Sequence, residues 1–226
     1  MHTFSVIVAA LLATAYATAS KTSKASKMYN LKVTNLTYRQ PLSPVLAVAH
    51  TKDIQLFEEG EEASAGLRMM AENGNNTALA VSERIILSKY ICGYVVGTTP
   101  IAPGDSFEAD LEVSTEERCK YAYFSTVSML VNTNDAFMGV QTEPLPWYQM
   151  TWYPPAFDAG TEVNNEDCGF IPGPGCNDIS MENKPDYPGE GFIHVHRGMH
   201  DMTTDLPAAT YDWRNGVALV SLTKGH

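Results

Sequence analysis

The sequence predicts a single all-β domain built from antiparallel strands, of the sandwich or barrel type. Short segments rich in β-branched residues alternate apolar and polar side chains. Pro-Gly and Gly-Asp turns separate these segments, and only one stretch has the composition of a helix. Of the 226 residues, 44% are hydrophobic, so the chain can bury a substantial core.

The expected strands follow one another along most of the chain. Residues 29–37 form the first, because Leu31, Val33 and their neighbours alternate with polar positions. A turn at 102–105 (Ala-Pro-Gly-Asp) separates two of the later strands. The remaining strands are predicted at residues 45–50, 84–96, 106–113, 121–131, 191–196 and 217–222.

One segment, residues 61–72, is predicted to be a short helix on a connection. Leu67, Met70 and Ala71 fall at positions i, i+3 and i+4, which places them on one apolar face. Asn73-Gly74 then provides a stop signal.

Residues 143–190 differ from the rest, since they hold eight of the thirteen prolines. Long ordered loops in a compact domain are usually functional. This stretch also contains an aromatic run of Trp147, Tyr148, Trp152 and Tyr153. These side chains could form a sugar-stacking or protein-binding surface, or they could cap the end of the core.

The N-terminal region is predicted to be a targeting segment. Residues 1–19 carry a short apolar run and small residues at Ala17-Thr18-Ala19, as in a cleaved signal peptide. Residues 20–27 are small, polar and basic, which is typical of a flexible linker. The body of the domain is expected over residues 28–226, with no segment apolar enough to insert in a membrane.

Four cysteines in an exported chain predict two disulfides. The short Gly/Pro loop from Cys168 to Cys176 favours a local bridge, which leaves Cys92 to pair with Cys119. The competing interpretation is a zinc site, but the spacings contain no Cys-x-x-Cys pair.

The formal net charge of −11 argues against a nucleic-acid partner, because neutralising phosphates requires a surface rich in Lys and Arg. An acidic chain fits either recruitment of cations or simple solubility.

A carboxylate group formed by Asp135, Asp158 and Glu162 is the first candidate site. Asp158 and Glu162 lie four residues apart around Gly160, so a tight turn can direct both to one point. Asp135 can approach from a neighbouring strand end. Calcium takes six to eight oxygen ligands, which such a group could begin to supply. The alternative is that these acids are merely solvated.

The second candidate is a zinc site made by His194, His196 and His200, because residues i and i+2 of a strand share a face. Such a site could support a zinc-dependent hydrolase. The alternative is two ordinary histidines beside a turn. No G-x-S-x-G elbow and no phosphate-binding G-x-x-x-x-G-K loop occurs in the sequence.

A set of short stretches, taken in order, resembles the spondin N-terminal (F-spondin) domain family. The resemblance covers residues 28–224, and together the stretches are specific although each is weak alone. They are residues 33–37, 40–44, 50, 56–60, 63–64, 71–74, 128–131, 133–137, 158–162, 212–213 and 217–218.

This resemblance implies an eight-stranded antiparallel sandwich similar to C2 domains, with one Ca²⁺ held by loops at one end. By motif, its ligands would be Asp135, Asp158 and Glu162. The last acid is Glu where animal relatives have Asp, so its longer arm shifts the ligand oxygen or permits bidentate binding.

We therefore expect a secreted, calcium-binding adhesion or recognition module of the extracellular matrix or cell surface. Its partner would be an extracellular protein or glycan, and we expect no enzymatic activity. The alternatives are the zinc-dependent hydrolase and a structural secreted protein without a metal.

Overall fold

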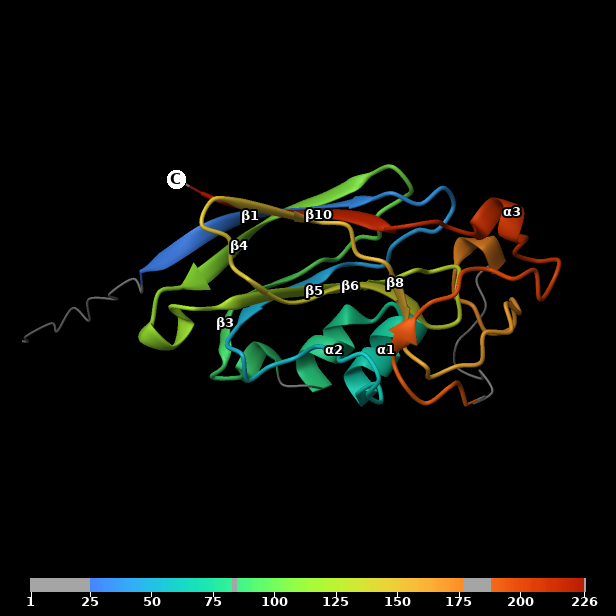
Figure 1. Cartoon of the computed structure of the whole chain (residues 1–226), viewed down its shortest axis with the longest axis horizontal. Helices are drawn as coiled ribbons and strands as arrows, with labels where there is room; N and C mark the ends of the chain where they lie inside the picture. The colour runs from blue at the N-terminus through green and yellow to red at the C-terminus, as the bar shows by residue number, and fades with distance from the viewer. Residues whose placement is uncertain (1–24, 83–84, 177–187, 226) are drawn as a thin grey trace, which may run out of the picture.

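Two antiparallel sheets stack face to face in the computed structural model, which describes residues 25–82, 85–176 and 188–225 (Figure 1). This confirms the predicted all-β sandwich. The predicted signal peptide at 1–19 lies outside the described residues. The first strand begins at Ser26, so the last two residues of the segment expected to be a linker, 20–27, belong to the sandwich.

Over the described residues, the sheets contain ten strands rather than the expected eight. The first sheet has four strands in the order β4-β1-β10-β7 and the second has six in the order β3-β2-β5-β6-β8-β9. The first is made of β1 (Ser26–Asn35), β4 (Ser106–Ser114), β7 (Gln149–Trp152) and β10 (Ala218–Lys224). The second is made of β2 (Leu46–His50), β3 (Ile91–Val96), β5 (Tyr123–Met129), β6 (Ala136–Pro144), β8 (Ala156–Asp158) and β9 (His194–Val195).

The predicted helix is present as α1 (Ala65–Asn73), and Leu67, Met70 and Ala71 are all fully buried. Ser64 caps its start, and Gly74 ends it in the left-handed region at φ 67°. The expectation of one helix was nevertheless too low. The described part of the chain also contains α2 (Asn76–Ser82), α3 (Ala208–Tyr211) and the 3₁₀ turns η1 (Ile85–Leu87), η2 (Glu117–Cys119) and η3 (Pro174–Cys176).

The second sheet is buried on both faces. Along β2, Ala47 and Ala49 face the core between the sheets, whereas Leu46 and Val48 face the cluster that contains α1 and α2. Figure 1 shows these two helices covering the outer face of that sheet. The fold is therefore a sandwich with a helical layer added on one side.

Double burial explains why β6 was not predicted. Phe137 packs toward the helical layer while Ala136 and Met138 pack between the sheets, so the sequence shows no apolar–polar alternation. The short strands β7 and β8 were not predicted because prolines flank them, and proline is typical of loops and strand ends. The expected strand at 84–96 was too long, because η1 occupies its first part and β3 starts only at Ile91.

Both predicted disulfides are present, Cys92–Cys119 and Cys168–Cys176. The second closes a loop beside a small apolar cluster of Ile171, Met199 and Leu206. Within the described parts of the chain, no helix is both long and apolar enough to cross a bilayer.

Candidate metal centre

Asp135 and Asp158 come together because their strands are neighbours. Ala136, the first residue of β6, pairs with Asp158, the last residue of β8. The backbone N–H of Ala159 also donates to the carbonyl of Asp135 at 3.3 Å. Two acids separated by 23 positions in sequence therefore sit at the same end of the sandwich.

The turn after β8 brings Glu162 to the same place. Gly160 adopts φ 66°, and its N–H donates to Asp158 Oδ1 at 2.8 Å. The next two backbone N–H groups, of Thr161 and Glu162, donate to Asp135 Oδ2 at 2.7 and 3.0 Å. One carboxylate oxygen of Asp135 thus holds the backbone of the turn that carries Glu162.

All three acids are buried, with exposed fractions of 0% for Asp135, 1% for Asp158 and 6% for Glu162. They are therefore not solvated surface acids. Asp135 Oδ1 is buried without a hydrogen-bond partner. Burial first, and then the charge of Asp158, raise the pKa of Asp135 to about 8 despite the hydrogen bonds that favour its ionised form.

Asp158 is oriented by a polar pair behind it. Asn164 Nδ2 donates to Asp158 Oδ2 at 2.6 Å, and Asn164 Oδ1 lies 3.2 Å from His196 Nε2. His196 Nδ1 accepts a backbone N–H from Gly198, which places the proton of the neutral ring on Nε2. Burial, followed by the charges of His194 and His200, lowers the pKa of His196 to about 4, so the ring is neutral near pH 7. His196 Nε2 also lies 3.8 Å from Asp158 Oδ2, a contact between a carboxylate and a neutral ring rather than an ion pair.

The structure adds two residues that sequence reasoning did not place in the acidic site. In the described chain, the one group of at least three His, Cys, Asp or Glu side chains with ligand atoms within 4.8 Å of one another is Asp158, Glu190 and His194. Glu190 was not singled out at all. Its position four residues before His194, within the same Gly-rich segment, was the available signal.

The three histidines of the zinc hypothesis do not form one ligand set. His194 and His196 both face Asp158, at 3.8 Å from its two oxygens. His200 instead lies 3.9 Å from Glu166, whose carboxylate also accepts the backbone N–H of His200. The expected cluster of His194, His196 and His200 is therefore wrong as a three-histidine site.

The donor set available at this end consists mainly of oxygens: the carboxylates of Asp135, Asp158 and Glu162, with Glu190 at the rim. Hard divalent cations such as Ca²⁺ prefer carboxylate and carbonyl oxygens. A buried carboxylate oxygen without a hydrogen bond, beside a second acid, is what a cation would neutralise. The donor types fit the calcium ion that the resemblance implies. Of the three predicted ligands, however, only Asp158 belongs to the group whose ligand atoms lie within 4.8 Å of one another, so Asp135, Asp158 and Glu162 do not form one ligand set in the described chain.

The family comparison agrees with the fold. The family model described as Spondin_N matches residues 19–169, which is 151 of the 226 residues. The matched region includes Asp135, Asp158 and Glu162 and ends before Glu190 and His194. No curated protein matches the chain.

Proposed function

The chain belongs to the spondin N-terminal domain family, and from this membership we propose that it is an extracellular calcium-binding recognition module rather than an enzyme. The observation that carries the proposal is Asp135. Its carboxylate is fully buried, one oxygen has no hydrogen-bond partner, and a second acid lies beside it. Such a group costs free energy unless it is protonated or neutralised by a cation.

Calcium would supply positive charge that neutralises Asp135, Asp158 and Glu162 together. The chain's own residues hold the frame. Asp135 Oδ2 secures the 161–162 turn, and Asn164 and His196 orient Asp158. Outer contacts of this kind commonly set the affinity of a metal site.

The extracellular assignment rests on the family and on two disulfides, which persist in oxidising compartments. Family membership supports the proposed role in adhesion. The rim beside the acidic site, where Glu190 and His194 are partly exposed, would meet an extracellular protein or glycan.

Thermal melting in calcium and in chelator tests the metal site. Binding to the native state alone adds RT ln(1 + [L]/Kd), about 2.7 kcal/mol at a hundredfold excess over Kd. For a domain of this size that corresponds to a rise in Tm of roughly 5 to 10 °C. We expect this rise for the parent and its loss in Asp158→Asn.

Asp110→Asn is the matched control, because Asp110 is an exposed acid on β4 that lies outside the acidic site. It should keep the full calcium response. A parent Tm that ignores calcium, or an Asp158→Asn protein that responds like the parent, would contradict the proposal. Elemental analysis of the purified protein separates calcium from zinc: one equivalent of zinc lost in His194→Ala would instead indicate a zinc ion held by Asp158, Glu190 and His194.

A further inference from the structure

The end of the sandwich opposite the acidic site carries a recess of about 550 Å³. Figure 1 shows that the start of β1 and the C-terminus lie at one end, whereas β8 and α3 lie at the other. The recess opens between the two sheets. Tyr29, Val113 and Lys224 come from one sheet, and Tyr123 and Leu145 come from the other sheet and its continuation.

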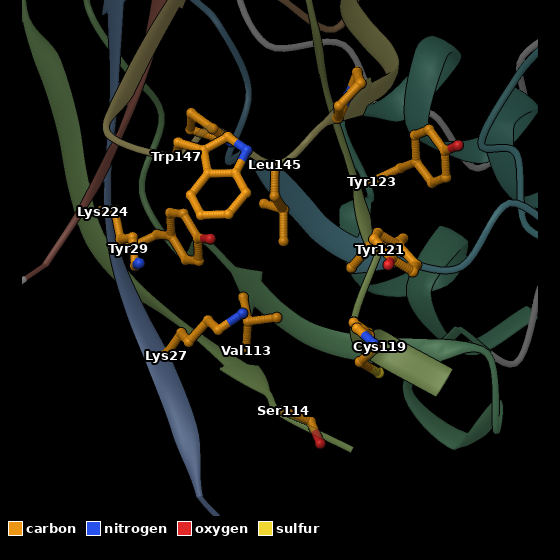
Figure 2. Close-up of a pocket in the computed structure, with 14 residues that line it drawn as sticks. Lys27, Tyr29, Val113, Ser114, Cys119, Tyr121, Tyr123, Leu145, Trp147 and Lys224 are labelled. Atoms are coloured by element: carbon orange, nitrogen blue, oxygen red, sulfur yellow. The ribbon is translucent and has the colours of Figure 1, made fainter. Parts of the chain in front are cut away.

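Aromatic side chains form the walls of this recess (Figure 2). Figure 2 shows Trp147 beside Leu145 and Tyr29 on one side, facing Tyr121 and Tyr123 on the other. Trp147 is 93% exposed and Tyr121 is 78% exposed. The aromatic residues predicted from the sequence therefore have two different roles. Trp152 stacks on Phe124 in the core, whereas the exposed ring of Trp147 is open to a ligand.

A second recess, of about 480 Å³, adjoins the first and shares Tyr121 and Tyr123 with it. It lies around the start of β3 and is lined by Lys52, Lys89 and Arg118. The two recesses thus make one surface divided by a wall of two tyrosines, and we call this surface the basic end.

The charge of the basic end is opposite to that of the whole protein. Six of the fifteen Lys and Arg residues line it, against one of the twenty-six acids, Asp53. The six are Lys27, Lys52, Lys89, Arg118, Lys120 and Lys224. Arg118 and Lys120 already pair with Glu116 and Glu117 at the start of η2, which leaves the other four to meet a ligand.

We propose that the basic end binds an acidic polysaccharide independently of calcium. Ring faces of Trp147 and Tyr121 can stack on sugar rings. The lysines can pair with carboxylate or sulfate groups repeated along the chain. Two joined recesses suit an extended polymer. A flat lipid surface would not need such concavity.

The test is binding to immobilised polyanions, measured by surface plasmon resonance in chelator with the mature chain. Heparin represents a sulfated polymer, polygalacturonate a carboxylated one, and dextran a neutral one. We expect binding to at least one polyanion and none to dextran. Kd should rise with salt, because association with a polyanion releases condensed counterions.

Lys27→Gln and Lys224→Gln should each weaken binding by roughly three- to tenfold and flatten the salt dependence. Trp147→Ala should weaken binding at every salt concentration. Lys32→Gln, on an exposed lysine of β1 paired with Glu108, and Tyr38→Ala, on an exposed ring outside the recesses, are the matched controls.

Equal losses in the test and control variants would overturn the proposal. So would binding to neither polyanion, or binding only to anionic phospholipid vesicles. Because all measurements are made in chelator, their outcome is separate from that of the calcium experiment.

Discussion

The two carboxylate oxygens of Asp135 lie in environments with opposite effects on its pKa. Oδ2 accepts three hydrogen bonds from Thr161 and Glu162, while Oδ1 is buried without a partner. The first arrangement favours the ionised form, and burial beside Asp158 favours the protonated form. Without a cation, the second prevails and raises the pKa to about 8.

This raised pKa predicts how the metal-free protein responds to pH. A carboxyl whose pKa rises from 3.8 to about 8 on folding stabilises the fold at low pH and loses that contribution as the pH rises to 8. His196 acts in the opposite direction, because its pKa falls from 6.5 to about 4 and its contribution is lost only on acidification. The lowered pKa of His50 has the same sign as that of His196.

The pH range in which the effect of Asp135 can be measured without a contribution from the two histidines therefore lies between pH 6.5 and 8. In chelator, we expect the Tm of the parent to fall across this range and the Tm of Asp135→Asn to stay level. Calcium binding requires the ionised carboxylates, so saturating calcium should remove or reverse the slope. Parallel curves for parent and variant in chelator would show that Asp135 is not the group responsible.

At the scale of elements, the turn after β8 positions the acidic site. Gly160 has φ 66°, and a Cβ at this position would lie 2.3 Å from the backbone oxygen of Phe192. Only glycine fits both the left-handed conformation and the close approach of the neighbouring segment. The turn and the segment before β9 are therefore interlocked.

Gly160→Ala should destabilise the fold by roughly 3 kcal/mol or more and weaken calcium binding, since the backbone must move. Gly104→Ala is the matched control, because Gly104 has φ 84° with nothing within 4 Å of an added Cβ. It should cost only about 1 to 2 kcal/mol, the cost of the left-handed backbone, and leave calcium binding unchanged. Chemical denaturation and calcium titration measure the two effects, and equal costs would contradict the interlocked turn.

Elements that the sequence shows clearly are those with one exposed face or a sharp boundary. From Tyr29 onward β1 alternates buried and more exposed side chains, and α1 has an apolar face and ends at Gly74. β6 escaped prediction because both of its faces are buried. The sequence did not predict Glu190 and His194 as partners of Asp158. The pairing of β8 with β9 joins residues that are far apart in the chain, so local spacing carries no signal for it.

The whole molecule separates two kinds of charge between its ends. The acids Asp135, Asp158 and Glu162 are buried at the start of β6 and the end of β8, whereas the lysines of the basic end lie around the two recesses that share Tyr121 and Tyr123. The paired strands β5, β6 and β8 lie between them, and the two proposed sites share no residue.

This arrangement predicts that the two ends act independently. Asp158→Asn should abolish the calcium response and leave polyanion binding intact, and Lys27→Gln with Lys224→Gln should do the reverse. In the combined variant, the changes in unfolding free energy should add within about 0.5 kcal/mol, as for distant sites. A loss of polyanion binding in Asp158→Asn, measured in chelator, would show that the ends are coupled.

The sequence by itself determined the class of fold, the helix α1, both disulfides and the three acids worth examining. Each of these depends on local information: alternation of side chains, a terminal glycine, the count of cysteines, or a motif that resembles a family. Only the tertiary structure decided that the acids are buried, that His200 lies with Glu166, and that lysines from distant segments gather at one end. The reason is that strand pairing brings together residues far apart in the chain, and burial depends on all the layers around them.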